Sequence, residues 1–380
     1  MRNFELETFF STWEFTARHH MTASDMESMS LADLLSLADP HDSKELLELR
    51  LGYTQTWGAD DLRKLIAGTY DSLGAEHVLC LAGAGEGIYA AMRVLLTPQD
   101  HAIVVVPNYQ SAETIALEVC EVTGVALHEA RNWQLDIAEV EAAIRPNTKL
   151  VSINFPHNPT GALMAHDDLA ALVELCRKHD LTLFSDEVYR GVEIEAADRM
   201  PQIADIYEKG ISLNVMSKAY GMPGLRIGWV ASKDTDVLQK IERYKHYLSI
   251  CNSGPSERLA VIALEHRDTI LDRNRAIVRE NVVKLEALFN DFPGLFEWQR
   301  PKGGCVAFPK YTGPDGVEAF CKSLLKDSGV LLLPASVYKS ELLDTPVDNF
   351  RIGFGRGAVF AEGLEAMRSH LETHYGEFRR

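Results

Sequence analysis

The sequence predicts an α/β fold, with a mostly parallel central sheet in a large domain and a smaller α+β domain. From about residue 62 to 229, short apolar runs alternate with stretches whose apolar residues recur at helical spacing, such as Ile88, Ala91, Met92 and Leu95. The runs are apolar nearly throughout, which is typical of strands covered on both faces. Repeated strand–helix units indicate parallel strands with helices on either side. The expected strands are Val78–Ala82, Ala102–Val106, Leu150–Phe155, Leu181–Val188, Ser212–Ser217 and Ile227–Ala231.

The pattern changes after Gly254-Pro255, where a long and broken helix is expected from Ser256 to about Phe292. Mixed strands and helices follow it. We therefore predict an N-terminal arm over residues 1–45 that packs on the small domain, a large domain over 46–285 and a small C-terminal domain over 286–380. The remaining expected elements are the strands Cys305–Pro309, Val330–Pro334 and Phe350–Phe354 and the helices Val317–Leu325 and Ala361–Tyr375.

Charge and composition exclude several classes of partner. The 380 residues include 38 basic and 55 acidic side chains, for a formal net charge of −17. A chain with this charge has no general attraction for nucleic acid or for an anionic membrane surface. No run approaches the roughly 18–20 apolar residues that a spanning helix needs. The first residues show no apolar segment behind a basic start, so we expect a cytoplasmic protein.

The cysteines are expected to be reduced thiols that pack as small apolar side chains. No two of them form a CxxC pair, and most lie in apolar surroundings. No sequence cluster of ligand residues indicates a metal site, and His19-His20 is an isolated pair. The six cysteines are Cys80, Cys120, Cys176, Cys251, Cys305 and Cys321.

Two turns that follow expected strands have the composition of ligand-binding loops. Gly83-Ala84-Gly85-Glu86-Gly87 opens a helix, where free backbone amides and glycines suit a phosphate. Asn158-Pro159-Thr160-Gly161 follows the next strand but one, and open α/β sheets bind ligands at the carboxyl ends of their strands. Taken singly, each segment is equally an ordinary turn.

Charged side chains follow two further expected strands. Asp186 and Glu187 end an apolar strand, and because a buried carboxylate is costly unless it is paired, we expect a cationic partner. Lys218 follows the strand that ends near Ser217; partial desolvation would lower its pKa and favour Schiff-base chemistry. Arg226 lies beyond two glycines that allow the chain to turn back, where its guanidinium suits a phosphate.

Arg351 lies inside an apolar strand, Phe350–Phe354, near the C-terminus. A buried guanidinium needs an anionic partner. A substrate carboxylate and a structural salt bridge both satisfy that need.

Together these motifs resemble the class I/II aminotransferases, the fold-type I enzymes that use pyridoxal 5′-phosphate (PLP). The resemblance covers residues 53–351 and keeps the order of the family's motifs. It implies that an amino group moves from an amino acid to a 2-oxo acid. The matching segments are the Gly-Ala-Gly-Glu turn, the aromatic residue in Pro107-Asn108-Tyr109, Asn158-Pro159-Thr160-Gly161, Asp186 to Tyr189, Ser217-Lys218 with Gly-x-x-Gly-x-Arg226, and Arg351.

The resemblance implies roles for the predicted site residues. Lys218 would hold PLP as a Schiff base and move a proton between the substrate Cα and the cofactor. Asp186 would pair with the ring nitrogen, while Asn158 and Tyr189 would hydrogen-bond the ring's phenolate oxygen. Arg351, together with Asn158, would bind the substrate through its α-carboxylate.

Other residues would surround the ring and its phosphate. Tyr109 would stack on one face of the ring and Val188 would pack on the other. The sequence departs from the commoner family pattern at Gly85, where many relatives have a hydroxyl side chain, and at Val215. The phosphate would be held by the backbone amides of Ala84 and Gly85 together with Ser217 and Arg226.

Tyr53 resembles the family tyrosine that reaches the phosphate in the neighbouring subunit, which implies a homodimer. The reaction after substrate binding stays open, because enzymes of this fold also act as cyclases, oxidases and C–S lyases, and the arm resembles more weakly a capreomycidine synthase-like branch. Glu14, Asp25 and Glu27 of the arm suit a cationic side chain. Ser24-Asp25-Met26-Glu27 also has the form of a helix capping box, which we favour.

Overall fold

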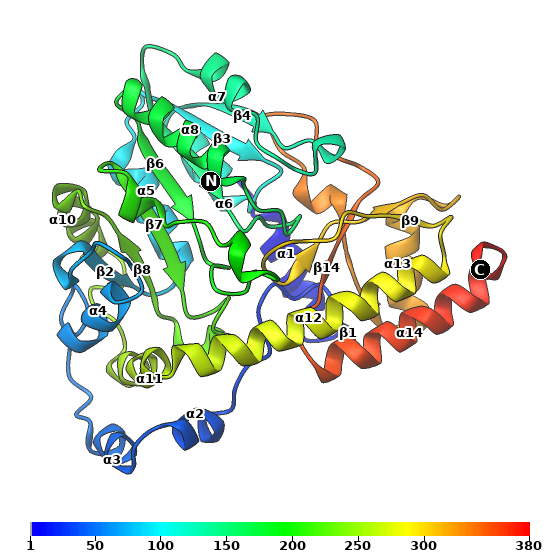
Figure 1. Ribbon diagram of the computed structural model, residues 1–380, viewed down its shortest axis with the longest axis horizontal. Helices are drawn as coiled ribbons and strands as arrows, with labels where there is room; N and C mark the ends of the chain where they lie inside the picture. Colours follow the sequence, from blue (N-terminus) through cyan, green and yellow to red (C-terminus); the bar gives the residue numbers. More distant parts are fainter. Residues whose placement is uncertain (1) are drawn as a thin grey trace.

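The computed structural model describes residues 2–380. A central sheet of seven strands, in the order β2-β8-β7-β6-β5-β3-β4, forms the large lobe (Figure 1). All neighbouring pairs are parallel except those that involve β8, which is antiparallel to β7 and β2. The predicted α/β class is therefore confirmed. The strands are β2 (Val78–Leu81), β3 (His101–Val106), β4 (Glu121–Ala126), β5 (Thr148–Asn154), β6 (Thr182–Asp186), β7 (Gly210–Val215) and β8 (Gly228–Ala231).

Successive residues of the central strands enter two separate cores. Val151 packs with the α8 side of the sheet, while its neighbour Leu150 packs with α5 and α10. This alternation explains why the strands are apolar throughout, since helices cover both faces. The helices of this lobe are α4 (Asp60–Ala67), α5 (Ala84–Leu95), α6 (Ser111–Leu117), α7 (Ile137–Ala143), α8 (His166–Lys178), α9 (Ile203–Ile206) and α10 (Thr235–Lys245), with single 3-10 turns at Ala75–His77, Glu129–Arg131, Ala196–Asp198 and Pro223–Leu225.

One strand of the sheet was not predicted. β4 lies at the edge, pairs only with β3, and is largely accessible along its Glu-Val-Thr-Gly-Val-Ala sequence. Its polar residues and its glycine give it none of the continuous apolar character of the central strands. Edge strands carry a weaker sequence signal because one side of the strand faces solvent.

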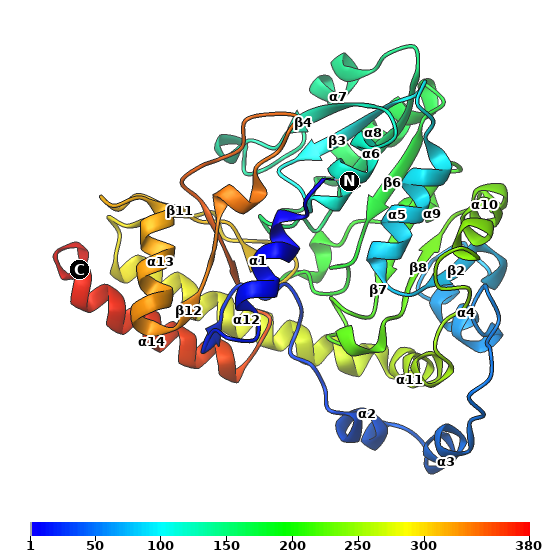
Figure 2. The ribbon, with the colours of Figure 1, turned by 180° about the vertical axis from the view of Figure 1, so that it is seen from behind.

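The second lobe contains short strands packed against two helices, with the predicted broken helix running alongside (Figure 2). The break falls at His266, between α11 (Gly254–Glu265) and α12 (Arg267–Asp291). The helix α12 passes through residue 285, where we predicted a domain boundary, and the division into domains stays a prediction. The other elements are β9 (Phe296–Glu297), β10 (Val306–Ala307), β11 (Lys310–Tyr311), α13 (Val317–Ser328), β12 (Val330–Leu331), β13 (Leu333–Pro334), a 3-10 turn at Ala335–Tyr338, β14 (Phe350–Gly353), α14 (Ala358–His374) and a 3-10 turn at Gly376–Phe378.

The N-terminal segment runs between the lobes. The strand β1 (His19–His20) pairs in parallel with β12 near the other end of the chain. Residues 21–29 then pass so close to β14 that a side chain on Gly353 would lie 1.9 Å from the carbonyl oxygen of Ala23. The helices of this segment are α1 (Glu5–Trp13), α2 (Leu31–Leu37) and α3 (Pro40–Glu48). No helix in residues 2–380 is long and apolar enough to cross a membrane.

Candidate active site

Lys218 lies just after β7, at the carboxyl edge of the central sheet. Its side chain is partly buried, and Nζ donates a hydrogen bond to Ser24 Oγ at 2.9 Å. The surrounding protein lowers the pKa of Lys218, chiefly by removing water from the ammonium group, while Asp25 opposes that effect. The same serine accepts a hydrogen bond from Tyr189 Oη through its carbonyl oxygen at 3.0 Å. The arm therefore lies against two of the predicted catalytic side chains.

A second buried lysine shows why Lys218 is the reactive candidate. Lys245 is fully buried and its pKa is also lowered by burial. Its ammonium, however, donates to three oxygens, the carbonyls of Thr56 and Cys80 and the side chain of Asn252, at 2.6, 2.9 and 2.7 Å. An ammonium has three donors, so Lys245 is fully used in holding the fold. Lys218 has a single such partner within residues 2–380.

Asp186 is the last residue of β6, on the strand next to β7. Burial raises its pKa to about 6, and its Oδ1 accepts only the backbone N–H of Val188, at 3.2 Å. No cation forms an ion pair with Asp186 in the described part of the chain, so the expected protein partner is absent. Lys218 is the one cation that acts on its pKa electrostatically. A carboxylate without a cation at a strand end is suited to a positively charged ligand group.

Glu187, the next residue, is held by hydrogen bonds within the fold. It accepts hydrogen bonds from the backbone of Ile203 and the hydroxyl of Ser212, at 3.0 and 2.9 Å. Burial raises its pKa to about 7. No ion pair within residues 2–380 involves Glu187 either, so the described part of the protein supplies the expected cationic partner to neither carboxylate.

Arg351 is a guanidinium with no accessible surface and no ion pair to any described carboxylate. Its Nη2 donates to the carbonyl oxygen of Thr22 at 2.7 Å, and its Nη1 donates to Tyr338 Oη at 2.6 Å and Asn158 Oδ1 at 3.2 Å. The ring of Phe10 lies 5.5 Å from the guanidinium carbon. The structural salt bridge left open by the sequence is therefore not formed, and the site favours an anionic ligand.

A second group of predicted residues surrounds the N-terminus of α5. Arg226 adopts a left-handed backbone conformation (φ 54°), and its Nη1 lies 3.5 Å from Ser217 Oγ. A side chain on Gly83 would lie 2.5 Å from Arg226 Nη2, so only glycine leaves room for the guanidinium. Ala84 and Gly85 begin the helix, and Gly85 is exposed with free space beside it. Free amides, a hydroxyl and a guanidinium together suit a phosphate.

A known protein family matches most of the chain that forms this arrangement. The family described as aminotransferase class I and II matches residues 35–366. This chain belongs to that family.

Similar proteins support the assignment and show its range. Capreomycidine synthase from Streptomyces vinaceus is 28% identical over 380 aligned residues, which cover 97% of this chain and 94% of that protein. A PLP-dependent aminotransferase from Streptococcus suis 89-1591 is 31% identical, with a TM-score of 0.91 over 98% of both chains. The PLP-dependent cyclase OrfR is 25% identical, with a TM-score of 0.88 over 98% of both. As a class I/II aminotransferase family member, the protein is a PLP-dependent enzyme of fold type I.

The residues present fit PLP. The unpaired carboxylate of Asp186 suits a protonated ring nitrogen, and Lys218, whose lowered pKa favours the neutral amine with its lone pair, suits covalent attachment. Tyr109 Oη donates to Glu7 at 3.0 Å, and Asp186 acts on its pKa, so the two side chains lie near each other. The group of residues at the start of α5 that suits a phosphate completes the set. Which atoms of PLP each of these residues contacts stays a prediction.

Tyr53 stands apart from the other predicted residues. Its side chain is 90% exposed and touches no other part of the site within one chain. This position neither supports nor contradicts a role across a subunit interface.

No helix begins at Ser24 to Glu27, so the favoured capping-box interpretation is wrong for these residues. Asp25 forms a bidentate ion pair with Arg356, at 2.9 and 3.0 Å, and Glu27 accepts the backbone N–H of Gly357 at 2.7 Å. Residues 22–30 lie outside any helix. The capping box of this segment is instead at Ser30 and Asp33, which begin α2.

Three further side chains of the site were not predicted. Tyr338 contacts both Arg351 and Asn158, at 2.6 and 3.0 Å, and Thr22 and Ser24 contact Arg351 and Lys218. Tyr338 and Thr22 belong to no motif of the chain, and Ser24 was singled out only as part of a capping box. The sequence contains one indirect signal for these residues. A buried arginine and a buried lysine need oxygen partners, and the motifs themselves do not supply them.

Proposed function

We propose that this protein is an aminotransferase that moves an amino group from an amino acid to a 2-oxo acid through Lys218. The observation that carries the proposal is the convergence of Lys218, Asp186 and Arg351, three charged side chains that form no ion pair within residues 2–380. A cofactor with a cationic ring nitrogen and an amino acid with a carboxylate supply both missing charges. When bound, PLP supplies the electron sink that stabilises negative charge at the substrate Cα.

Each residue then has a separate task. The lowered pKa of Lys218 lets its side chain become a neutral amine at a pH closer to neutrality than for an ordinary lysine. The amine moves the proton at the substrate Cα. Asp186 holds the proton on the cationic ring nitrogen. Arg351 orients the amino acid by its carboxylate, with Asn158 and Tyr338 fixing the direction of the guanidinium.

Substrate access to Arg351 requires the arm to move. Thr22 and Phe10, both from the arm, lie against the guanidinium, which has no accessible surface. A carboxylate that reaches Arg351 exchanges the neutral Thr22 carbonyl for an acceptor of opposite charge, which can take two parallel hydrogen bonds from the guanidinium. The arm also excludes water from the proton transfer once it returns.

The test combines one variant with chemical trapping. Lys218→Ala, supplied with PLP, an amino acid and a 2-oxo acid, should lose transamination by at least 10³-fold. Borohydride reduction of the PLP-loaded wild-type protein should attach the cofactor to Lys218, while Lys245 serves as the internal control of a buried but fully bonded lysine. Full activity of Lys218→Ala, or label on Lys245, contradicts the proposal.

A second candidate function is a cyclase acting on an amino acid with a cationic side chain. Two similar proteins are a capreomycidine synthase and a PLP-dependent cyclase. In this chain Glu14 is half-buried near Lys218, and burial raises its pKa. Glu7 lies close to the same lysine. These two carboxylates are not committed to an arginine or lysine partner within residues 2–380.

The two functions are separated by a panel of amino acids that includes arginine and its hydroxylated forms. An aminotransferase needs a 2-oxo acid for repeated turnover and forms the matching amino acid from it. A cyclase turns over without any 2-oxo acid and gives a product of lower mass than its substrate. Mass spectrometry of reactions with and without the acceptor distinguishes the outcomes.

We also propose that the working unit is a homodimer and that Tyr53 completes the partner's site. Other large apolar side chains are exposed, notably Leu47 and Leu51, which are near Tyr53 in the sequence, and Tyr247. Exposed apolar patches of this kind mark interaction surfaces. The division into an arm, a large domain and a small domain at residues 45 and 285 belongs to the same proposal.

A further inference from the structure

His370 is a buried histidine without a hydrogen-bond partner. Its side chain is 4% exposed, and neither ring nitrogen has a partner in the described part of the chain. Burial lowers its pKa, so the ring is neutral at neutral pH and offers a lone pair. Buried polar groups in folded proteins nearly always have a partner, so this ring indicates an occupant that the protein itself does not provide.

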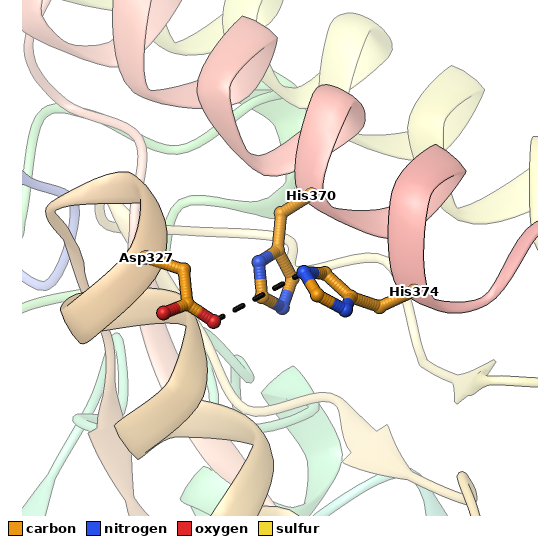
Figure 3. Close-up of side chains that lie close together, drawn as sticks. All are labelled: Asp327, His370 and His374. Atoms are coloured by element: carbon orange, nitrogen blue, oxygen red, sulfur yellow. Dashed lines mark ion pairs between the residues drawn. The ribbon is translucent and has the colours of Figure 1, made fainter.

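Two other ligand-type side chains face the same place. His374 lies one helical turn further along α14, and its ring centroid is 4.4 Å from that of His370. Asp327, from the last turn of α13, lies 4.0 Å from His374 Nε2. Figure 3 shows the two imidazoles side by side on α14, facing the carboxylate across the gap between the helices. One potential ligand atom from each residue lies within 4.8 Å of the others.

We propose that Asp327, His370 and His374 form a zinc site that joins α13 to α14. Two imidazoles and a carboxylate are ligands that Zn²⁺ accepts in tetrahedral sites, with bonds of about 2.0–2.2 Å. Those bonds place neighbouring ligand atoms about 3.3 Å apart. The site therefore contracts when the ion binds. The Asp327 and His374 side chains are 42% and 47% exposed, so they are free to rotate inward while His370 stays fixed by packing.

The charges around the site favour a cation. Asp327 stands at the C-terminal end of α13, where the helix already carries partial negative charge, and an acidic side chain there is unfavourable without a cation. Asp315 is a second carboxylate within electrostatic reach of His370. The imidazoles select zinc-like ions over Mg²⁺ and Ca²⁺, which prefer oxygen ligands. Three protein ligands leave one position for water.

The site lies away from the catalytic residues in sequence and in the elements that carry it. Neither α13 nor α14 contributes a residue to the candidate active site. The zinc ion would therefore stabilise the packing of the second lobe rather than take part in the reaction. The ion would supply a partner for one of the two buried nitrogens of His370.

The test uses PLP-loaded protein purified without a histidine tag and treated with a chelator. Wild-type protein should bind one Zn²⁺ per chain by calorimetry, and its melting temperature should rise with zinc concentration. His374→Ala and Asp327→Asn should each weaken zinc affinity at least tenfold and remove the melting shift. The substituted side chains of both variants are half-exposed, so we expect the variants to fold. A substitution of the buried His370 would disturb the packing around it.

A matched control comes from α3, where His41 and Glu45 form an exposed pair 3.0 Å apart with no buried third ligand. His41→Ala should leave zinc affinity unchanged. Transamination should be the same with and without zinc in all four proteins. Zinc uptake that is absent in the wild type, or equal in the wild type and His374→Ala, overturns the proposal. Binding of Mg²⁺ with similar affinity also overturns it.

Discussion

Adjacent carboxylates at the end of β6 have different surroundings, and the difference predicts different roles. Glu187 is held by a backbone amide and a serine hydroxyl, whereas Asp186 accepts one backbone amide. Asp186→Asn should still bind PLP but lose transamination by about 10³-fold, because an amide cannot hold the ring nitrogen protonated. Glu187→Gln, which keeps its hydrogen-bond acceptor, should retain activity within a few-fold. Steady-state kinetics on both variants, with PLP content measured by absorbance, checks this.

Stability against pH tests the environment of Asp186 without any activity. Its pKa in the folded protein is about 6, above the ordinary value of 3.8. The folded state therefore binds the proton more tightly than the unfolded state, so its contribution to stability is present below pH 4 and is lost as pH rises through 6. In cofactor-free protein, Asp186→Asn should be more stable than wild type above pH 6, by up to about 3 kcal/mol, with no difference near pH 4.

The control for that measurement has the opposite sign. Asp136 is hydrogen-bonded to Arg131, which lowers its pKa. Its stability contribution is present at neutral pH and is lost on acidification, so Asp136→Asn should be less stable than wild type at pH 7. A profile for Asp186→Asn that follows Asp136→Asn contradicts the assignment of an uncompensated carboxylate.

Single side chains at strand ends were the most predictable part of the site. Lys218, Asp186, Asn158 and Arg351 could be predicted because a charged or amide group next to an apolar strand is conspicuous. The role of Ser24 could not, because its local pattern, Ser24-Asp25-Met26-Glu27, is that of a capping box and says nothing of a lysine partner. Its contact with Lys218 depends on residues 194 positions apart meeting in the fold.

At the scale of elements, the start of α5 depends on one glycine. Gly83 has φ 105° and leaves no room for a side chain beside Arg226. Gly83→Ala should displace the guanidinium, lower PLP affinity at least tenfold and destabilise the protein by about 1–3 kcal/mol. Gly85→Ala is the matched control, because Gly85 is helical with open space beside it and should be neutral or slightly stabilising. Fluorescence titration with PLP and thermal melts measure both effects. Equal losses of PLP affinity in the two variants would falsify this account of the turn.

The elements of the sheet interior could be predicted from apolar runs, and the edge and the arm could not. Most residues of strand β4 are only partly buried, and β1 and β12 contain two residues each. Short strands of this kind form because the rest of the fold brings their partners together, not because of local preference. The expected capping box at Ser24 was wrong for the same reason, since Asp25 and Glu27 contribute more by pairing with Arg356 and Gly357 than by starting a helix.

At the scale of the whole molecule, the proposed dimer predicts that two inactive variants restore each other. Lys218→Ala lacks the reactive lysine, and Tyr53→Ala would lack the hydroxyl for the partner's phosphate. If Tyr53 acts across the interface, mixed dimers carry one intact site. Co-refolded variants should then recover about a quarter of wild-type activity.

Size-exclusion chromatography with light scattering should give twice the chain mass of 42.4 kDa for each variant alone. No recovery of activity on mixing, with mixed dimers demonstrated by tagged chains, places the function of Tyr53 within its own subunit or outside catalysis.

The contacts of the arm also determine when this protein becomes complete during synthesis. Thr22 leaves the ribosome well before its partner Arg351, which lies 329 residues later in the chain. At 5–20 residues per second, the arm waits roughly 15–65 seconds for that partner. During this interval Met21 lacks the C-terminal part of its core, which includes Phe354 and Gly363, because those residues are still unmade. A ribosome-bound chain that stops before β14 should therefore be protease-sensitive at the arm although its central sheet is already formed.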